Sequence, residues 1–352
     1  MRTSVVARCS AVAAIAVLLA ACGTLPFDSA QGRLAQDDMQ PPIGAPGAIR
    51  QAPADAARAY RGRSWMDAGA KDQDLLYVTN QNGVVNVYRY WQHTLVGVLT
   101  DFEQPMGECV DASGNVYITD YQANKVEEYA HGGMKPTYVI KDTYGPYGCA
   151  IDPKTGNLAV ANFGAYYGKG GNLEIYVHAR GKPIKYGATC YNSQFLSVGY
   201  DKYGNLLSEA SFHYDGSYSG NFYYLPAKAK TVSCLDIPGP RSSWNWYQVS
   251  SILWDGKYWV IDSDGLYRYS INIKAQYIDT ITLSGEGNLG PIAIYRKSLD
   301  AYGTQLVGTS GYLYSGTPEV TYWKYPAGGD PIFQITSKDL DKPYGVSISL
   351  KP

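Results

Sequence analysis

The residues that could do chemistry in this sequence are few and widely spaced. No two of its four histidines have the spacing of metal ligands. They are His93, His131, His178 and His213. Other polar side chains recur roughly every 45 residues, at Asn80, Asp120, Asn162, Glu209 and Asp262. One ligand from each repeat would lie too far from the others to share a metal ion. We therefore expect no catalytic residue, no metal and no cofactor, and we expect these side chains to cap the loops that follow them.

The sequence around Cys22, near the N-terminus, predicts a more specific chemistry. Two arginines precede an apolar run over residues 11–21, which is too short to span a bilayer. The run ends in the sequence LAACG at residues 19–23, which resembles the lipobox of bacterial lipoproteins. The resemblance implies that residues 1–21 are a signal peptide and that Cys22 becomes the lipidated first residue. An ordinary secretory signal followed by a chance cysteine is the alternative.

Residues 22–70 have the composition of a flexible tether. The segment contains Pro, Gly, Ala, Gln and Asp with few large apolar residues, so it cannot bury enough surface to offset its ordering entropy. It would hold the folded domain, residues 71–352, away from the membrane. We therefore expect a lipid-anchored protein of the bacterial envelope that faces outside the cytoplasm. The net charge of −1 gives no basic excess, so no nucleic-acid partner is expected.

The folded domain is built from a repeated unit. Residues 105–129 contain three apolar runs separated by an Asp-x-x-Gly-Asn turn and a polar break, which is typical of short strands joined by tight turns. The strand after the turn recurs at residues 75–80, 116–120, 158–162, 206–209, 258–262 and 305–309. A period in the forties with several strands per repeat predicts the blades of a β-propeller.

The two ends of the repeat array complement each other. The N-terminal repeat begins with its second strand, 75–80, and the chain ends with an unpaired first strand, 344–349. Pairing these two strands completes one blade and removes the free sheet edges. The sequence therefore predicts an all-β, six-bladed β-propeller closed between its N- and C-terminal strands, with seven blades as the alternative.

The repeats resemble those of NHL-repeat propellers. The matching residues are Pro105-Met106-Gly107 with the run from Asp111 to Asp120, and Pro146-Tyr147-Gly148 with Asp152, Gly156, Asn157 and Asn162. The resemblance spans about residues 74 to 352 and is close only in the second and third blades, since the last turn reads Tyr295-Arg296-Lys297-Ser298 without the Asp. Propellers of this family include binding modules, lyases and lactonases, so the fold does not fix the function.

Four cysteines remain in the expected mature domain besides Cys22. They are Cys109, Cys149, Cys190 and Cys234, an even number that permits disulfides in an exported protein. Cys109 and Cys149 lie in innermost strands of neighbouring blades, which makes them our first choice for a bridge; free buried cysteines are the alternative. Glu108 lies beside them and could face the channel, without an evident partner.

The two rims of the predicted ring differ in their loops. Turns between first and second strands are short, whereas several connections on the opposite rim are long, at residues 163–171, 210–220, 238–248 and 310–317. These long loops combine aromatic rings with small polar residues, a composition suited to recognition. Packing of the rings over the blade ends is the alternative. We predict a binding face with Tyr166, Tyr214, Trp244, Trp246 and Tyr312 among its contacts.

The sequence thus favours a membrane-anchored propeller that binds an envelope polysaccharide, a peptide or a protein partner. A metal-dependent enzyme of the lactonase or lyase kind is the alternative, and it would need acids, Asn or His from several blades converging near the axis. A subunit of a cell-surface complex is a third interpretation.

Overall fold

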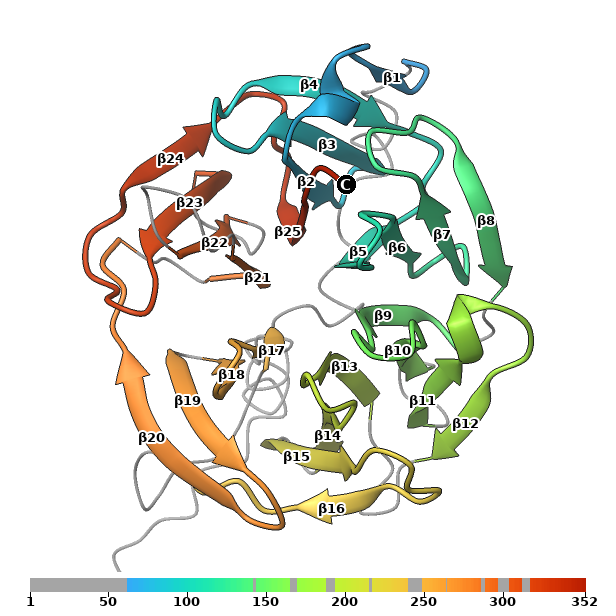
Figure 1. Cartoon of the computed structure of the whole chain (residues 1–352), viewed down its shortest axis with the longest axis vertical. Coiled ribbons are helices and arrows are strands. Elements are labelled where there is room, and N and C mark those ends of the chain that lie inside the picture. Colours follow the sequence, from blue (N-terminus) through green and yellow to red (C-terminus); the bar gives the residue numbers. More distant parts are fainter. Residues whose placement is uncertain are drawn as a thin grey trace, which may run out of the picture. The chain divides into compact units, whose positions relative to one another are not determined.

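The computed structural model describes residues 62–352 with short gaps. The gaps are residues 142–143, 165–169, 188–193, 215–216, 240–248, 264, 286–288, 297–303 and 312–316, and only the backbone is described at 212–214 and 217–219. Six antiparallel sheets surround a common centre (Figure 1), so the predicted six-bladed β-propeller is confirmed. The described helices are two single 3-10 turns, η1 (Ala70–Asp72) and η2 (Val177–Ala179).

Each blade runs from an innermost strand at the axis to an outer strand. Blade 1 contains β25 (Pro343–Ser349), β2 (Leu75–Asn80), β3 (Val84–Arg89), β4 (Leu95–Leu99) and β1 (Trp65–Met66); blade 2 contains β5 (Pro105–Val110), β6 (Val116–Asp120), β7 (Lys125–Tyr129) and β8 (Pro136–Lys141); blade 3 contains β9 (Pro146–Ile151), β10 (Leu158–Gly164), β11 (Gly170–Tyr176) and β12 (Ile184–Gly187). Blade 4 contains β13 (Gln194–Tyr200), β14 (Leu206–Tyr214), β15 (Ser217–Leu225) and β16 (Ser233–Leu235); blade 5 contains β17 (Ser251–Trp254), β18 (Trp259–Asp262), β19 (Leu266–Ile271) and β20 (Ala275–Ile281); blade 6 contains β21 (Ile292–Tyr295), β22 (Gln305–Ser310), β23 (Glu319–Lys324) and β24 (Phe333–Thr336).

The ring closes where the sequence predicts. β2 pairs with β25 in antiparallel register, with Leu75 opposite Ser349 and Val78 opposite Val346. The ordered sheet begins earlier than the expected boundary at residue 71, because β1 pairs with β4 as a fifth strand of blade 1. Part of the segment assigned to the tether therefore belongs to the propeller.

The repeated Asp-x-x-Gly-Asn sequence is explained by a self-contained turn. Asp111 Oδ1 accepts the backbone amides of Ser113 and Asn115 at 2.9 and 2.8 Å, and its Oδ2 accepts the Asn115 side-chain amide at 2.8 Å. Gly114 occupies the left-handed region at φ 81°, which a side chain would disfavour. The carboxylate thus satisfies the backbone donors that the tight reversal leaves without a sheet partner.

The Pro-x-Gly motifs are explained by crowding at the axis. A Cβ on Gly107 would lie 2.6 Å from the carbonyl oxygen of Tyr147, and a Cβ on Gly345 would lie 2.3 Å from that of Met106. These glycines therefore let innermost strands of adjacent blades approach closely. Threonine hydroxyls in second strands tie three of the blades to the next one. Thr79 donates to the Met106 carbonyl at 2.6 Å, Thr119 to that of Tyr147 at 2.9 Å, and Thr309 to that of Tyr344 at 2.6 Å.

The hydrophobic core is divided into layers between neighbouring blades. Leu76 and Tyr88 of blade 1, for example, pack in one cluster with Val307 and Tyr322 of blade 6. Five further clusters join the remaining pairs of adjacent blades. Because each sheet buries both faces against its neighbours, second strands such as β2 and β6 are buried along their whole length.

In two segments expected to be loops, the described residues are strand. β10 and β11 extend to Gly164 and from Gly170, and β14 and β15 run to Tyr214 and from Ser217. The second case is a long hairpin, because Gly and Ser at these positions do not interrupt an antiparallel ladder that pairs on to Tyr214 opposite Ser217. The predicted loop at residues 210–220 is therefore wrong for its described part.

Candidate functional site

The innermost strands of the six blades surround the axis of the ring (Figure 1). Three cavities of about 60, 310 and 450 Å³ share lining residues and follow one another along it. The smallest lies where the innermost strands begin, beside Tyr147, Leu196 and Tyr344. The largest lies beyond their ends, beside Asp111 and Leu350. The three cavities therefore form a channel that joins the long-loop rim, where innermost strands begin, to the short-turn rim, where they end.

Aromatic rings occupy the channel end at the long-loop rim. Met106, Tyr147, Phe163, Leu196 and Tyr344 form one buried cluster drawn from four blades. Tyr147 and Tyr344 meet edge to face with ring centroids 5.6 Å apart, an arrangement favoured by the ring quadrupoles. The described side chains thus make this end of the channel apolar.

Glu108 is the acid that lines the middle of the channel, as its place in an innermost strand predicts. Its Oε2 accepts the Ser347 hydroxyl at 2.7 Å, while its Oε1 is buried and accepts no hydrogen bond. Burial raises the pKa of Glu108 to about 8, although the Ser347 hydroxyl and the Thr79 backbone amide oppose the rise. The carboxyl is therefore mostly neutral at pH 7.

The polar residues at the ends of second strands act as caps. Asp120 receives a backbone hydrogen bond from Ala123 in the predicted following loop, and it also caps the connection that precedes its own blade. Asp120 accepts the backbone amides of Glu103 and Gln104 at 3.0 and 2.8 Å. These amides lie in the connection that enters the innermost strand of the same blade, not in the loop that follows Asp120. Asn80 Oδ1 accepts the Asp341 amide at 3.0 Å in the same way. Sheet geometry explains this, because the end of β6 lies beside the start of β5.

Glu209 lies one position earlier in blade 4, where blade 2 has Thr119, and is fully buried. Its Oε1 accepts the Ser211 hydroxyl at 2.7 Å, and its Oε2 is buried without a hydrogen bond. Burial raises the pKa of Glu209 to about 8, against a lowering by Ser211. The carboxyl group is near Tyr344, whose pKa is raised by burial and also by Glu209 and Asp262.

The histidines are held separately around the ring. His131 lies 2.6 Å from the Ser349 hydroxyl and 2.9 Å from the Gln73 carbonyl, and His178 lies 2.8 Å from the Thr155 carbonyl. His93 stacks on Phe333 with centroids 3.7 Å apart. Within the described part of the chain, no group of three or more His, Cys, Asp or Glu could hold a metal ion.

Cys109 and Cys149 are joined by a disulfide, with Cα atoms 5.7 Å apart. The bridge ties the innermost strands of blades 2 and 3, and both cysteines line the middle cavity. Cys234 is also disulfide-bonded. The channel wall thus carries a covalent link between two blades, in the pairing that the sequence favours.

Most of the predicted binding residues lie outside the described residues. These are Cys22, Tyr166, Trp244, Trp246 and Tyr312. The backbone of Tyr214 lies at the end of β14, beyond the last residue of that strand that pairs with β13, Ser211. The backbone of residues 212–214 and 217–219 therefore extends past the described innermost strand at the long-loop rim.

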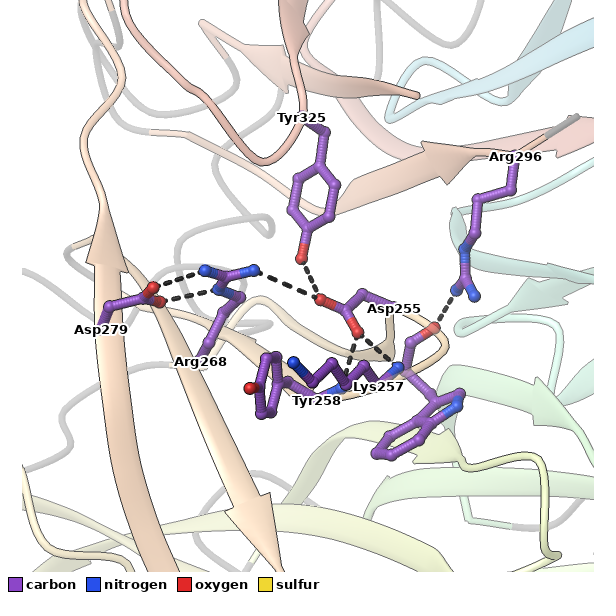
Figure 2. A network of polar contacts seen from close by, with 8 residues as sticks. Asp255, Lys257, Tyr258, Arg268, Asp279, Arg296 and Tyr325 are labelled. Carbon is purple, nitrogen blue, oxygen red and sulfur yellow. Dashed lines mark hydrogen bonds and ion pairs between the residues drawn. The ribbon is translucent and has the colours of Figure 1, made fainter. Parts of the chain in front are cut away.

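A polar network at the short-turn rim was not predicted from the sequence (Figure 2). Asp255 accepts the Tyr325 hydroxyl at 2.6 Å and lies 3.8 Å from the Arg268 guanidinium, which also forms a two-point ion pair with Asp279. Arg296 donates to the Trp254 carbonyl at the edge of this network. One sequence feature could have pointed to this network. The residue directly after the innermost strand is Asp in blades 2 to 5, whereas in blade 6 it is Arg296.

Comparisons with known proteins support the fold alone. No family profile and no curated protein matches the chain in sequence. A chain in the crystal structure of a nidogen/laminin complex is 14% identical with a TM-score of 0.59, covering 79% of this chain and 99% of that one. A protein of unknown function from Bacteroides caccae is 11% identical with a TM-score of 0.58 and the same coverage. A functionally unknown protein from Desulfotomaculum acetoxidans is 9% identical with a TM-score of 0.52, covering 80% and 100%. None of the described helices is long and apolar enough to cross a membrane.

Proposed function

We propose that this chain is a lipid-anchored envelope protein whose propeller binds a polysaccharide, a peptide or a protein partner at its long-loop rim. The lipid is attached at Cys22, and the binding contacts include Tyr166, Tyr214, Trp244, Trp246 and Tyr312. The NHL-like sequence of blades 2 and 3 is compatible with such a role, because propellers of that kind include binding modules. The propeller serves as the rigid scaffold that positions the rim.

The observation that carries this proposal is the projecting hairpin of blade 4. β14 and β15 contain nine residues each, whereas β6 and β7 of blade 2 contain five each. Three residue pairs of the hairpin lie beyond the end of the pairing with β13: Phe212 with Ser219, His213 with Tyr218, and Tyr214 with Ser217. A hairpin that extends past the sheet carries aromatic residues outward on a fixed backbone, which lowers the entropy lost on binding.

The anchor is tested by changing its acceptor. Cys22→Ser should leave the precursor uncleaved or release the protein from the membrane fraction, because acyl chains contribute about 0.8 kcal/mol per buried CH₂. Fractionation and intact mass would show this. A variant that fractionates and weighs as the parent does would contradict lipidation at Cys22.

The binding face is tested separately on soluble protein that begins at residue 62. Trp244→Ala combined with Trp246→Ala should abolish capture of envelope material while the melting temperature changes little, because buried aromatic anchors contribute about 2 kcal/mol or more each. Replacing residues 212–219 with Asn-Gly, a turn that suits a two-residue hairpin, should weaken capture as well. Capture that survives both changes in folded protein would place the binding face elsewhere.

A further inference from the structure

The middle cavity of the channel has the size and lining of a small-molecule site. Its volume of about 310 Å³ lies at the lower end of the range of roughly 300–1,000 Å³ for ligand pockets. Its wall is contributed by all six innermost strands and exposes polar groups beside aliphatic side chains, which are those of Val110, Ile151, Val198, Ile252, Leu253, Ile292, Ile294, Val346 and Ile348. Such a wall suits a small molecule that has both an apolar and a polar part.

One positive charge lines this wall. Arg296 borders both the middle cavity and the wider one at the short-turn rim. The acid that lines the middle cavity is Glu108, which burial keeps mostly neutral at pH 7. In the wider cavity, Asp111 directs both carboxylate oxygens to its own turn. Among the residues that line the two cavities, Arg296 is therefore the cation that an anionic occupant would meet.

Arg296 replaces a residue that has a structural role elsewhere in the ring. In blades 2 and 4 the same position holds Asp111 and Asp201, which close their turns with hydrogen bonds to backbone and side-chain amides. Arginine cannot accept these bonds. Blade 6 has thus exchanged a turn-forming anion for a cation that lines the channel.

The nearby acids are already engaged with other groups. Arg268 forms the ion pair with Asp279, and Asp255 accepts Tyr325 and two backbone amides (Figure 2). None of the ion pairs among the described residues includes Arg296. Its guanidinium donates to one carbonyl, that of Trp254, and keeps further N–H donors for another acceptor.

We propose that the channel, entered from the short-turn rim, binds a small amphiphilic carboxylate. Its carboxylate pairs with the guanidinium of Arg296, and its hydrocarbon part lies along the aliphatic wall toward Glu108. A planar guanidinium matches a carboxylate through two parallel hydrogen bonds. The aromatic cluster at the far end limits the length of the chain that the channel accepts. This site lies on the rim opposite the proposed binding face, and it does not depend on that face.

The proposal is tested with octanoate as the probe, titrated calorimetrically into the soluble protein that begins at residue 62, at pH 7. Arg296→Gln should weaken octanoate binding about tenfold, corresponding to the loss of roughly 1.4 kcal/mol. Arg296→Lys should retain most of the affinity, because the charge remains. Binding of 1-octanol, which lacks the charge, should change little in either variant.

Two further variants distinguish binding inside the cavity from a general attraction of octanoate to positive charge at the rim. Lys257→Gln removes a positive charge from the same network without touching the cavity, so octanoate affinity should change less than about twofold. Leu253→Trp fills the wall of the middle cavity and should weaken both octanoate and octanol. The proposal is overturned if wild-type protein does not bind millimolar octanoate, if Arg296→Gln binds as the parent does, if Lys257→Gln weakens binding equally, or if folded Leu253→Trp binds both probes unchanged.

Discussion

The two rims of the propeller satisfy their polar groups in different ways. At the short-turn rim, Asp111 and Asp201 bind donors within four residues of their own position. At the long-loop rim, Asp120 binds amides 16 and 17 residues away, and Asn80 binds an amide 261 residues away. The turn carboxylates of the first rim therefore act locally, whereas these caps of the second rim join separate strands.

This difference indicates which positions of each rim tolerate substitution. A local turn needs its Asp and Gly, so a change at one turn leaves neighbouring blades intact, as the exchange of Asp for Arg296 in blade 6 shows. The long-loop rim depends on strands that are already assembled into the ring. Its caps, including Asp120 and Asp262, are fully buried, and their loss should propagate to the connection that enters each blade.

The largest effect should come from removing the strand that joins the ends of the ring. Deleting residues 343–352 removes β25, its ladder with β2, and the buried side chains of Tyr344 and Val346. It also exposes β2 as a free edge. We expect loss of cooperative unfolding and aggregation, measured by thermal melting and size-exclusion chromatography.

A matched control removes a strand from the outside of the same blade. Starting the chain at residue 67 deletes β1, which pairs with β4 over two residues, and should lower the melting temperature by only a few degrees. If the deletion of β25 proved no more harmful than that of β1, closure at this seam would not stabilise the ring.

The next effect concerns pH and the buried acid of the long-loop rim. The pKa of Glu209 is raised from 4.5 to about 8 by burial, so the folded state keeps a proton that the unfolded chain releases. Stability should therefore fall as pH rises from about 4.5 to about 8, by roughly 4 kcal/mol at most for this group. Glu108 contributes in the same direction. Urea unfolding at pH 5 and pH 8 should show a smaller fall for Glu209→Gln than for the parent.

An acid within the outer strand β20 provides the comparison. Its hydrogen bonds to Arg268 lower the pKa of Asp279, so its stabilising contribution is present above its unfolded pKa of about 3.8 and is lost only below that range. Asp279→Asn should therefore leave the change between pH 5 and pH 8 as in the parent. Equal slopes for the parent and Glu209→Gln would contradict a raised pKa at Glu209.

The sequence predicts the short-turn rim better than the long-loop rim. The Asp-x-x-Gly-Asn pattern places both the donor and the acceptor of each turn within five residues, so Asp111 to Asn115 can be interpreted without knowledge of the ring. The cap that Asp120 forms on Glu103 and Gln104 depends on which strand end lies beside Asp120 in the folded ring. The sequence alone predicts a cap only on the loop that follows Asp120. The hairpin at 210–220 was missed because small residues suggested a loop, whereas continued pairing decided the structure. Arg296 was noted as a departure from the pattern, but its position in the channel depends on all six blades.

The smallest expected effects are the losses of stability on removing one capping carboxylate from each rim. Asp120→Ala should leave the amides of Glu103 and Gln104 without their acceptor, and Lys125 Nζ, 3.6 Å away, without one of its two carboxylate partners. Unsatisfied buried donors cost about 1–3 kcal/mol, so we expect a loss of about 3 kcal/mol. Asp111→Ala should cost about 1 kcal/mol, because its turn is partly exposed and water replaces the carboxylate. Thermal melting should resolve the difference, at roughly 2–4 °C for each kcal/mol. Asp120→Asn, which retains one acceptor oxygen, should fall between the two, and equal losses at Asp120 and Asp111 would show that the two rims are held alike.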